Sequence, residues 1–323
     1  MKKPLIILAG PTAAGKTKTS ISLARAVGGE IISADSMQVY RHMDIGSAKI
    51  RPRETEGIPH HLIDVLDPEE EFHVVRFQQM AKQAAREILS RGKIPIVVGG
   101  TGFYIQALLY DIDFTENEEN RACRERLAAL AAKEGAAALH QMLYQVDPKA
   151  AEDIHENNIK RVIRALEFYQ LTGKRISQHN EEEKKKESPY NFAYFVLSDD
   201  RDRLYQRIGL RVDKMLSEGL VEEVRALKDR GLGRNMVSMQ GLGYKEILAF
   251  LDGEMSLDEA VYILKRDTRH FAKRQLTWFR RERDVIWLNQ GDFGYHEEEL
   301  LERMLSELKD RRIIGENGEI YGA

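Results

Sequence analysis

Residues Gly10 to Thr17 have the types and spacing to bind phosphate. They read G-P-T-A-A-G-K-T and complete the pattern G-x-x-x-x-G-K-[ST]. The pattern follows an apolar run, Leu5–Ala9, and precedes a helix-like stretch, Lys16–Val27. In that setting backbone N–H groups and a helix N-terminus point at a phosphate, Lys16 adds positive charge, and Thr17 offers its hydroxyl to Mg²⁺. We therefore expect a di- or triphosphate site rather than a glycine turn that merely joins a strand to a helix.

Asp35 is the first candidate for proton-transfer chemistry. It follows an expected strand, Glu30–Ser33, within the sequence S-A-D-S-M-Q-V-Y-R. The end of that strand should lie near the phosphate loop, Gly10–Thr17, so the carboxylate can face a bound substrate. It could bind Mg²⁺ through water, cap the start of a helix, or act as a general base. Its position alone leaves these three roles open.

A third feature is the lack of an acidic residue directly after the apolar strand expected at Ile94–Val98. Many phosphate-loop nucleotidases end an apolar strand with an acidic residue, which holds the metal and water for γ-phosphate chemistry. Here the apolar strand Ile94–Val98 ends in G-G-T-G. The glycines favour close approach of a ligand, with the Thr101 hydroxyl as its polar contact. This weakens an ATP-hydrolysis interpretation, although Asp64 could supply a carboxylate from elsewhere.

The segment from Lys265 to Arg283 is basic and aromatic on a chain of net negative charge. Two interpretations stay open. One is a solvated helix face with Phe271, Leu276 and Phe279 packed inward, and the other is an electrostatic footprint for nucleic acid. The residues that raise the question are Lys265, Arg266, Arg269, His270, Lys273, Arg274, Trp278, Phe279, Arg280, Arg281 and Arg283.

Other candidate positions carry weaker signals. By spacing alone, Arg211 is a surface arginine on a helix. His60 and His61 are adjacent, so their side chains cannot share a helical or strand face, and we do not expect a metal site there. Cys123 has no paired histidine and is expected to be an inert thiol.

Composition limits the class of protein. The chain has 323 residues, 42% hydrophobic and 31% charged, which fits a globular protein of about two domains or one domain with a large insertion. With a net charge of -3, any nucleic-acid surface must be a local patch. The single cysteine excludes an internal disulfide and a cysteine-based zinc site. Because no run approaches the ~18 apolar residues of a membrane span, we expect a cytoplasmic protein that does not bind membranes.

The elements expected in the first third alternate between strand and helix, which predicts a parallel sheet with helices on both faces. Ligands of such sheets bind at the carboxyl ends of the strands. The expected elements are Leu5–Ala9, Lys16–Val27, Glu30–Ser33, a short strand His61–Val65, Val74–Arg91 and Ile94–Val98.

The middle of the chain changes character, since residues 116–189 contain no buried-strand signal. An apolar strand returns at Phe192–Leu197, and the chain from Asp199 onward is expected to be mainly helical. The sequence therefore predicts an α/β fold: a P-loop NTPase-like core with a parallel sheet, formed by residues 1–115 and 190–323, plus a helical insertion domain, residues 116–189. The expected helices are Arg121–Lys133, Ala136–Gln145, Asn158–Leu171, Asp202–Glu218, Val221–Arg230, Gly243–Leu251 and Leu257–Arg281.

Several motifs in order along the chain resemble those of bacterial tRNA dimethylallyltransferases, also called tRNA isopentenyltransferases. They are G-P-T-A-A-G-K-T, D-S-M-Q-V-Y-R, M-D-I-G-S-A-K, P-H-H-L-I-D, V-V-G-G-T-G-F-Y, R-V-D-K-M-L, G-L-G-Y-K-E and A-K-R-Q-L-T-W-F-R. This family moves a dimethylallyl group from dimethylallyl diphosphate to the exocyclic amine of the adenosine 3′ to the anticodon. The resemblance implies a monomer with tRNA and dimethylallyl diphosphate as its partners and Mg²⁺ as its cofactor.

The resemblance also implies roles for single residues. Asp35 is the expected general base, and Thr101 is expected near the reacting centre. Lys16 and Arg211 would neutralise charge on the departing diphosphate, and Thr17 would hold Mg²⁺. The expected diphosphate-binding residues are Gly10, Pro11, Thr12, Ala13, Ala14, Gly15, Lys16 and Thr17.

The tRNA is expected to contact both parts of the chain. The target base must be unstacked from its loop before it can react. The expected tRNA-binding residues are Asp35, Ser36, Met37, Gln38 and Thr101 in the core, and Arg124, Lys160, Arg161 and Arg164 in the insertion. One departure is Ala14, where the family often has serine; the loop works mainly through backbone N–H groups, so little depends on it.

Other classes of function stay open at this level. A prenyltransferase acting on free adenine nucleotides shares the catalytic loop but should not need so long an insertion. A phosphate-loop small-molecule kinase would bind ATP productively. A non-enzymatic phosphate-loop RNA-binding module is disfavoured by Asp35 and Thr101 at adjacent strand ends.

Overall fold

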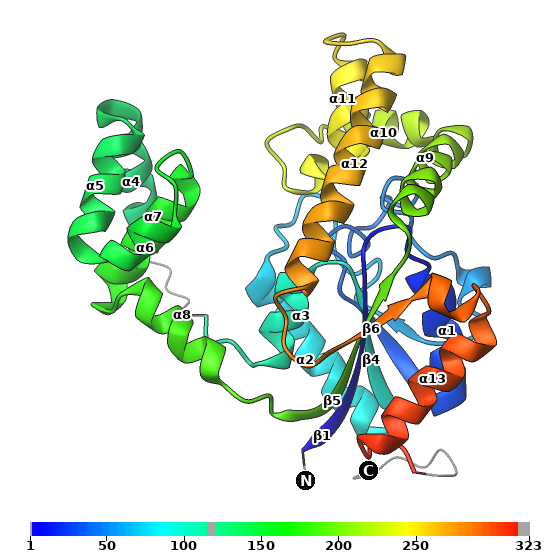
Figure 1. Ribbon diagram of the computed structural model, residues 1–323. Helices are drawn as coiled ribbons and strands as arrows, with labels where there is room; N and C mark the ends of the chain where they lie inside the picture. Colours follow the sequence, from blue (N-terminus) through cyan, green and yellow to red (C-terminus); the bar gives the residue numbers. More distant parts are fainter. Residues whose placement is uncertain (1, 115–119, 316–323) are drawn as a thin grey trace. The chain divides into compact units, whose positions relative to one another are not determined.

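The computed structural model describes residues 2–114 and 120–315 of the chain (Figure 1). The chain divides into two compact units, of which the first combines Met1–Leu109 with Pro189–Ala323 and the second is Tyr110–Ser188. The start expected for the insertion, residue 116, lies outside the described residues, as does residue 115, the end expected for the first part of the core.

A six-stranded parallel sheet forms the centre of the first unit, in the order β3-β2-β4-β1-β5-β6. β1 lies between β4 and β5, with Ile6 opposite both Ile96 and Ala193. It is buried from Pro4 to its end because neighbours cover both faces. The strands are β1 (Lys3–Ala9), β2 (Gly29–Ser33), β3 (His60–His61), β4 (Ile94–Gly99), β5 (Tyr190–Ser198) and β6 (Val285–Asn289). The predicted α/β fold with a parallel sheet is confirmed.

Helices cover both faces of this sheet. On one face lie α1 (Lys16–Val27) and α13 (Glu297–Asp310), which pack apolar residues such as Leu23 and Met304 onto the strands. The other face carries α2 (Val74–Ser90) and α3 (Gly102–Leu109), as Figure 1 shows. α1 begins and ends at the residues predicted for it, since Gly15 and Gly28 flank it in the left-handed conformation.

A helical layer follows β5 in the first unit. It contains α9 (Arg201–Ser217), α10 (Leu220–Asp229), α11 (Tyr244–Leu251) and α12 (Leu257–Phe279). Short 3₁₀ helices lie in the connections, at Pro52–Glu54, Ser238–Gln240 and Gln290–Phe293. α9 and α12 contact each other through a small core of Leu204, Ile208 and Ala272.

The second unit consists of helices in the part that the structure describes. They are α4 (Asn120–Glu134), α5 (Ala136–Val146), α6 (Pro148–Asp153), α7 (Ile159–Thr172) and α8 (Ile176–Lys185). The unit has its own apolar core, to which α4, α5, α6 and α7 contribute. Asp147 begins α6 and is nearly fully buried, accepting hydrogen bonds from Ala150 N at 3.1 Å and Ser177 Oγ at 2.6 Å.

Some sequence-based expectations for the elements were wrong. The short strand is His60–His61 and does not extend to Val65, because Leu62 and Asp64 have φ angles of 64° and 55°, outside the extended region. The chain after Asp199 is mainly helical, as expected, but it also returns to the sheet as β6, which was not predicted. Among the described residues, no helix combines the length and the apolar character needed to cross a membrane.

Candidate active site

The phosphate loop, Gly10–Thr17, joins β1 to α1 at the carboxyl edge of the sheet. Gly10 has a φ of 148°, and a Cβ there would lie 2.6 Å from the carbonyl oxygen of Leu197. Gly15 has a φ of 90° and precedes the first turn of α1. These glycines let the loop lie against the neighbouring strand and lead tightly into α1, whose N-terminus favours an anion.

Lys16 lies across this loop. Its Nζ donates to the carbonyl oxygens of Gly10 at 3.0 Å and Pro11 at 2.8 Å. Burial, with the neighbouring Arg211 adding to it, lowers the pKa of Lys16 to about 7, while the Asp35 carboxylate acts in the opposite direction. The ammonium group is therefore held in place beside positive charge that an anion would neutralise.

Arg211 reaches the same loop from α9. Its Nη1 donates to Thr12 Oγ1 at 3.2 Å, so the arginine predicted at the diphosphate does meet the loop. Burial lowers the pKa of Arg211, and Asp35 opposes this effect while Arg207 reinforces it. Arg207 lies one turn earlier on α9, 3.6 Å from Asp199. Within the described ranges, neither Lys16 nor Arg211 has a carboxylate within ion-pair distance, and Asp35 acts on both charges from farther away.

Asp35 follows the end of β2. Its negative charge favours the protonated forms of both Lys16 and Arg211 and so opposes the lowering of their pKa values. Its Oδ1 accepts hydrogen bonds from Met37 N at 2.8 Å and Gln38 N at 3.3 Å. The carboxylate thus caps a turn, not the helix start that was considered from the sequence. One oxygen is enough for this cap, and Oδ2 makes no hydrogen bond to any residue that the structure describes.

Thr101 lies beside Asp35 because the ends of β2 and β4 are in close contact. Thr101 N donates to Ala34 O at 3.3 Å, and a Cβ on Gly99 would lie 2.2 Å from the same oxygen. Glycine at the end of β4 is therefore required for this approach. The carbonyl oxygen of Thr101 accepts from Tyr104 N and so begins α3. The structure brings together Asp35 and Thr101, as the strand-end positions predicted.

Two glutamines complete the phosphate loop and were missed from the sequence. Gln275 of α12 accepts from Thr12 N at 2.9 Å and donates to Gly100 O at 2.9 Å. Gln290 donates to the carbonyl oxygen of Ala14. A signal for Gln275 existed, since it is a polar residue at the helical spacing of the buried Ala272 and Phe279. For Gln290 we find none.

The residues expected to receive the adenosine follow Asp35. Ser36, Met37 and Gln38 are half-buried. The Gln38 amide is already held at both ends: Oε1 accepts from Ser33 Oγ at 3.2 Å, and Nε2 lies 3.5 Å from the carbonyl oxygens of Ser47 and Ala48. The side chain of Gln38 therefore has a fixed orientation before any ligand binds.

Glu223 of α10 binds the backbone of residues 44–46, which lie in the loop after Gln38. Its carboxylate accepts the backbone N–H groups of Asp44 at 2.9 Å, Ile45 at 2.7 Å and Gly46 at 3.0 Å. The Tyr244 hydroxyl donates to it as well, at 2.8 Å. Three successive N–H groups around one carboxylate fix the backbone of this segment. No pattern in the sequence predicts this contact.

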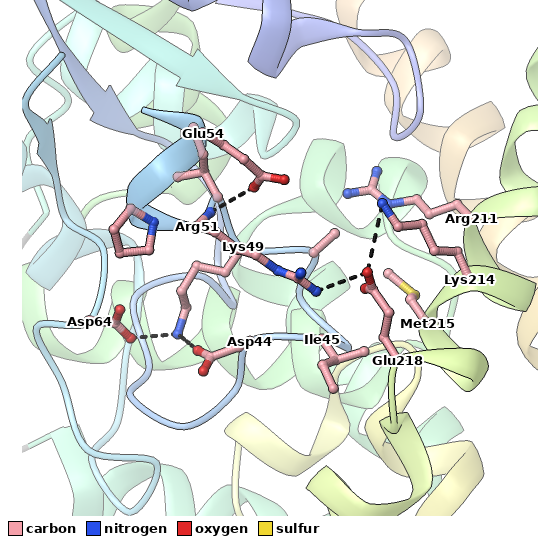
Figure 2. A pocket seen from close by; sticks show the side chains of 13 residues that line it. Asp44, Ile45, Lys49, Arg51, Glu54, Asp64, Arg211, Lys214, Met215 and Glu218 are labelled. Carbon is pink, nitrogen blue, oxygen red and sulfur yellow. Dashed lines mark hydrogen bonds and ion pairs between the residues drawn. The ribbon is translucent and has the colours of Figure 1, made fainter. Parts of the chain in front are cut away.

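A cavity of about 620 Å³ lies between this loop and α9. Figure 2 shows Arg211, Lys214 and Met215 on one side of it, facing residues of the 44–54 segment on the other. The lining residues are Asp44, Ile45, Ala48, Lys49, Ile50, Arg51, Pro52, Glu54, Asp64, Arg211, Lys214, Met215 and Glu218.

Most charges in this cavity are paired with one another. Lys49 is nearly fully buried and donates to Asp44 at 2.6 Å and Asp64 at 2.5 Å. Glu218 lies 2.9 Å from Arg51 and 3.8 Å from Lys214. Asp64, considered as a possible metal or water carboxylate, is therefore engaged with a lysine. Among the described residues, Arg211 is the cation lining this cavity that has no carboxylate within ion-pair distance. Its charge is therefore available to a ligand.

The Thr17 hydroxyl fits the metal role predicted for it. Thr17 is exposed at the start of α1, and its Oγ1 makes no hydrogen bond within residues 2–114 and 120–315. A single hydroxyl beside a phosphate site suits Mg²⁺, which keeps several waters and binds substrate oxygens. In the described parts of the chain, no three histidine, cysteine, aspartate or glutamate side chains cluster as a metal site.

Comparison with known proteins identifies the family. A model described as "IPP transferase" matches residues 38–282, and one described as "Isopentenyl transferase" matches residues 3–66. The chain belongs to the IPP transferase family. This confirms the family predicted from the motifs.

Individual members of the family are similar over almost the whole chain. The tRNA dimethylallyltransferase of Lachnoclostridium phytofermentans is 62% identical, covering 97% of this chain and 99% of that protein. The tRNA isopentenylpyrophosphate transferase of Bacillus halodurans, a crystal structure, is 45% identical with a TM-score of 0.72, covering 96% of this chain and 98% of its own. A eukaryotic dimethylallyltransferase crystallised acting on tRNA has a TM-score of 0.81 at 31% identity, over 95% of this chain and 79% of its own.

The IPP transferase insertion carries four residues predicted to bind tRNA, and the structure divides them into two pairs. Arg124 and Arg164 both lie close to Glu167, at 3.1 Å and 3.5 Å, and Glu167 is 1% exposed. These arginines balance a buried charge within the unit. Lys160 and Arg161 are exposed, and no acid among the described residues lies within ion-pair distance of either. They are the better candidates for contacts to phosphate.

The adjacent histidines and the cysteine have local structural partners. His61 Nε2 lies 2.8 Å from Glu30, which also pairs with Arg91 at 2.7 Å. His60 Nδ1 lies 2.8 Å from Ile58 O, and burial lowers the pKa of His60. The Cys123 thiol lies 3.1 Å from Gln170 Oε1.

Proposed function

We propose that this IPP transferase moves a dimethylallyl group from dimethylallyl diphosphate to the exocyclic amine of the adenosine 3′ to the anticodon in tRNA, and releases diphosphate. The named relatives are tRNA dimethylallyl- and isopentenyltransferases, which supports the reaction class. The acceptor in this proposal is tRNA, and the donor is an allylic diphosphate.

One observation carries the proposal: Lys16 and Arg211 both reach the phosphate loop without a carboxylate partner in the described chain. Partly buried positive charge of this kind is costly unless an anion neutralises it. A diphosphate leaving group provides that anion, and its negative charge increases as the bond to the allylic carbon breaks. The two cations therefore stabilise the transition state more than the bound donor.

The reaction needs a proton acceptor, and Asp35 supports that role. The lone pair of the adenine amine is delocalised into the ring, which makes the amine a poor nucleophile. In the proposed step its nitrogen bonds to the allylic carbon, the electron pair of the carbon–oxygen bond leaves with the diphosphate, and Asp35 takes the amine proton. The free Oδ2 can accept this proton while Oδ1 keeps its cap on Met37 and Gln38. Thr101 would contact the bridging oxygen or the nucleotide.

Thr17 would hold Mg²⁺ together with the diphosphate oxygens. When bound, the ion would neutralise charge on the leaving group. The protein would work as a monomer in the cytoplasm, where a reducing environment suits its single free cysteine.

Mass spectrometry of tRNA incubated with the protein and dimethylallyl diphosphate tests the proposal. We expect a mass increase of one dimethylallyl group on a fragment that contains the anticodon loop, and release of diphosphate. An anticodon stem-loop should react much faster than adenosine monophosphate. Equal rates would support an adenylate prenyltransferase. Turnover with ATP and a small acceptor, without prenyl transfer, would support a kinase.

A further inference from the structure

A turn formed by residues 44–48 reaches the side chain of Gln38. Ala48 N donates to Ile45 O at 3.0 Å and closes the turn. At this end, the carbonyl oxygens of Ser47 and Ala48 each lie 3.5 Å from Gln38 Nε2. The position of the 44–48 turn therefore decides where the Gln38 amide points.

Glu223 holds the other end of the same turn, and both of its carboxylate oxygens are used. Oε2 accepts the N–H groups of Asp44 at 2.9 Å and Ile45 at 2.7 Å. Oε1 accepts the N–H group of Gly46 at 3.0 Å and the hydroxyl of Tyr244 at 2.8 Å. A negative charge at successive backbone N–H groups is a strong anchor, so the turn is fixed by a side chain of α10.

Tyr244 of α11 supports this anchor. The residue is fully buried, and a Cβ on Gly46 would lie only 2.6 Å from its ring. Burial, with Glu223 adding to it, raises the pKa of Tyr244 well above its ordinary value, while a backbone hydrogen bond from Ser47 opposes the shift. The tyrosine therefore keeps its proton and stays a donor to Glu223.

The segment that leads into α11 also packs against Met37. A Cβ on Gly241 would lie 2.5 Å from Met37 Cε, and Gly241 O accepts from Tyr244 N at 3.2 Å. Met37 and Gln38 are two of the residues expected to receive the adenosine. Contacts from α10 and from the start of α11 thus reach both of them.

We infer that Glu223 is a positioning residue for the acceptor, which sets the orientation of the Gln38 amide through the 44–48 turn. The inference rests on the proposed function, because the acceptor is the adenosine of tRNA. An amide carries an acceptor oxygen and a donor nitrogen, so a turned or loosened amide offers the wrong group to a base. Ser33 Oγ holds Gln38 Oε1 at 3.2 Å, and the turn anchored by Glu223 holds Nε2.

The donor site depends on other contacts. Lys16 and Arg211 are held by the phosphate loop, through Pro11 O and Thr12 Oγ1. A loss of Glu223 should therefore affect the acceptor and spare the donor, whereas a general loss of structure would affect both.

The test uses Glu223→Gln, with Glu222→Gln as the matched control, because Glu222 is the exposed neighbour on the same helix. Glutamine must place its NH₂ group against groups that the carboxylate accepts. Rates are measured with an anticodon stem-loop RNA and dimethylallyl diphosphate, each varied at a saturating level of the other. We expect kcat/KM for the RNA to fall about 10–100-fold in Glu223→Gln, since small misplacements in a site have effects of this size. The KM for the donor should stay at the wild-type value, and Glu222→Gln should match the wild type throughout.

A double-mutant cycle with Gln38→Ala separates positioning from a purely structural role. If Glu223 acts through Gln38, Glu223→Gln should lower kcat/KM for the RNA much less in the Gln38→Ala protein than in the wild type. Thermal unfolding is measured for every variant. Tyr244→Phe removes a single hydroxyl and keeps the contacts of Glu223 with the turn, so it provides a milder variant that should change the RNA kinetics in the same direction.

Each outcome decides the inference. Additive losses in the cycle would assign Glu223 to stability and overturn it. A rise in the donor KM as large as the loss with RNA would overturn it too, as would wild-type RNA kinetics in both Glu223→Gln and Tyr244→Phe. The proposed function would survive these results as long as the wild-type protein prenylates the RNA. If the wild-type protein does not, the proposed function fails and the inference fails with it.

Discussion

Gln275 accepts a hydrogen bond from Thr12 N at 2.9 Å, so a residue of α12 fixes a residue of the phosphate loop 263 positions earlier. The amide at the other end of the same side chain donates to Gly100 O. One nearly buried glutamine therefore sets the spacing between the phosphate loop and the loop that carries Thr101.

Gln275→Leu should impair both folding and transfer. The substitution leaves Thr12 N and Gly100 O without their partner, and we expect a loss of about 1–3 kcal/mol in the free energy of unfolding. Urea unfolding measures this. Gln275→Glu keeps the acceptor for Thr12 but places negative charge at the anion site, so it should weaken donor binding more than it lowers stability. Normal donor binding by both variants would exclude Gln275 from the site.

Asp35→Asn separates the two uses of the carboxylate. The amide oxygen can still cap Met37 and Gln38, but it cannot take a proton. We expect Asp35→Asn and Asp35→Ala each to lower kcat by about 10²–10⁴-fold and to leave tRNA affinity nearly unchanged. Single-turnover rates with saturating donor measure the chemical step. Recovery of activity in the Asn variant alone would assign Asp35 to capping.

Arg211→Ala should raise the KM for dimethylallyl diphosphate and slow transfer. A charge-assisted hydrogen bond contributes about 1.5–3 kcal/mol, which corresponds to roughly ten- to a hundredfold. Arg201→Ala is the matched control, because Arg201 begins the same helix and lies over the Tyr205 ring, 5.2 Å from its centroid. A variant with weakened tRNA binding but wild-type donor dependence would place Arg211 outside the donor site.

Donor binding should take up a proton at Lys16. Without a ligand, the pKa of Lys16 is about 7. A bound diphosphate must raise this pKa, because an anion favours the ammonium form. Below pH 7 Lys16 is already protonated, so uptake should appear above pH 7 and the affinity for diphosphate should fall as pH rises further. Calorimetry in buffers of different ionisation enthalpy counts the protons. In the Lys16→Met variant the proton uptake by the protein should disappear. Any uptake that remains should come from protonation of the diphosphate itself.

The insertion offers a comparison of two charge pairs. Lys160→Gln with Arg161→Gln should flatten the salt dependence of tRNA binding by about 1.5 and leave unfolding unchanged, because both side chains are exposed without ion pairs in the described chain. Arg124→Gln with Arg164→Gln should destabilise the protein by about 1–2 kcal/mol, since Glu167 would stay buried without them. Donor binding should survive in both. The reverse pattern would assign Arg124 and Arg164 to tRNA.

Features that depend on nearby residues were predictable from the sequence. The phosphate loop, Asp35 and Thr101 each follow an apolar strand, and parallel strands bring such ends to one edge. α1 was predictable to the residue because glycines flank it. The family motifs also assigned Arg211, which spacing alone left on the surface.

Features that depend on distant packing were not predictable. The contacts of Gln275 and Glu223 join segments more than 170 residues apart. β6 is five residues long with Trp287 partly exposed, so it lacks the continuous buried run of β1 and β2. The low pKa of Lys16 arises from burial and from Arg211, both of which require the folded chain.

The discontinuous first unit has a consequence for synthesis of the protein. When a ribosome has released residues 1–109, the phosphate loop, Asp35 and Thr101 exist, but Arg211, Glu223 and Gln275 have not yet been made. The anion site can assemble only after α12 emerges, so a chain truncated before it would carry the motifs of the enzyme without its active site.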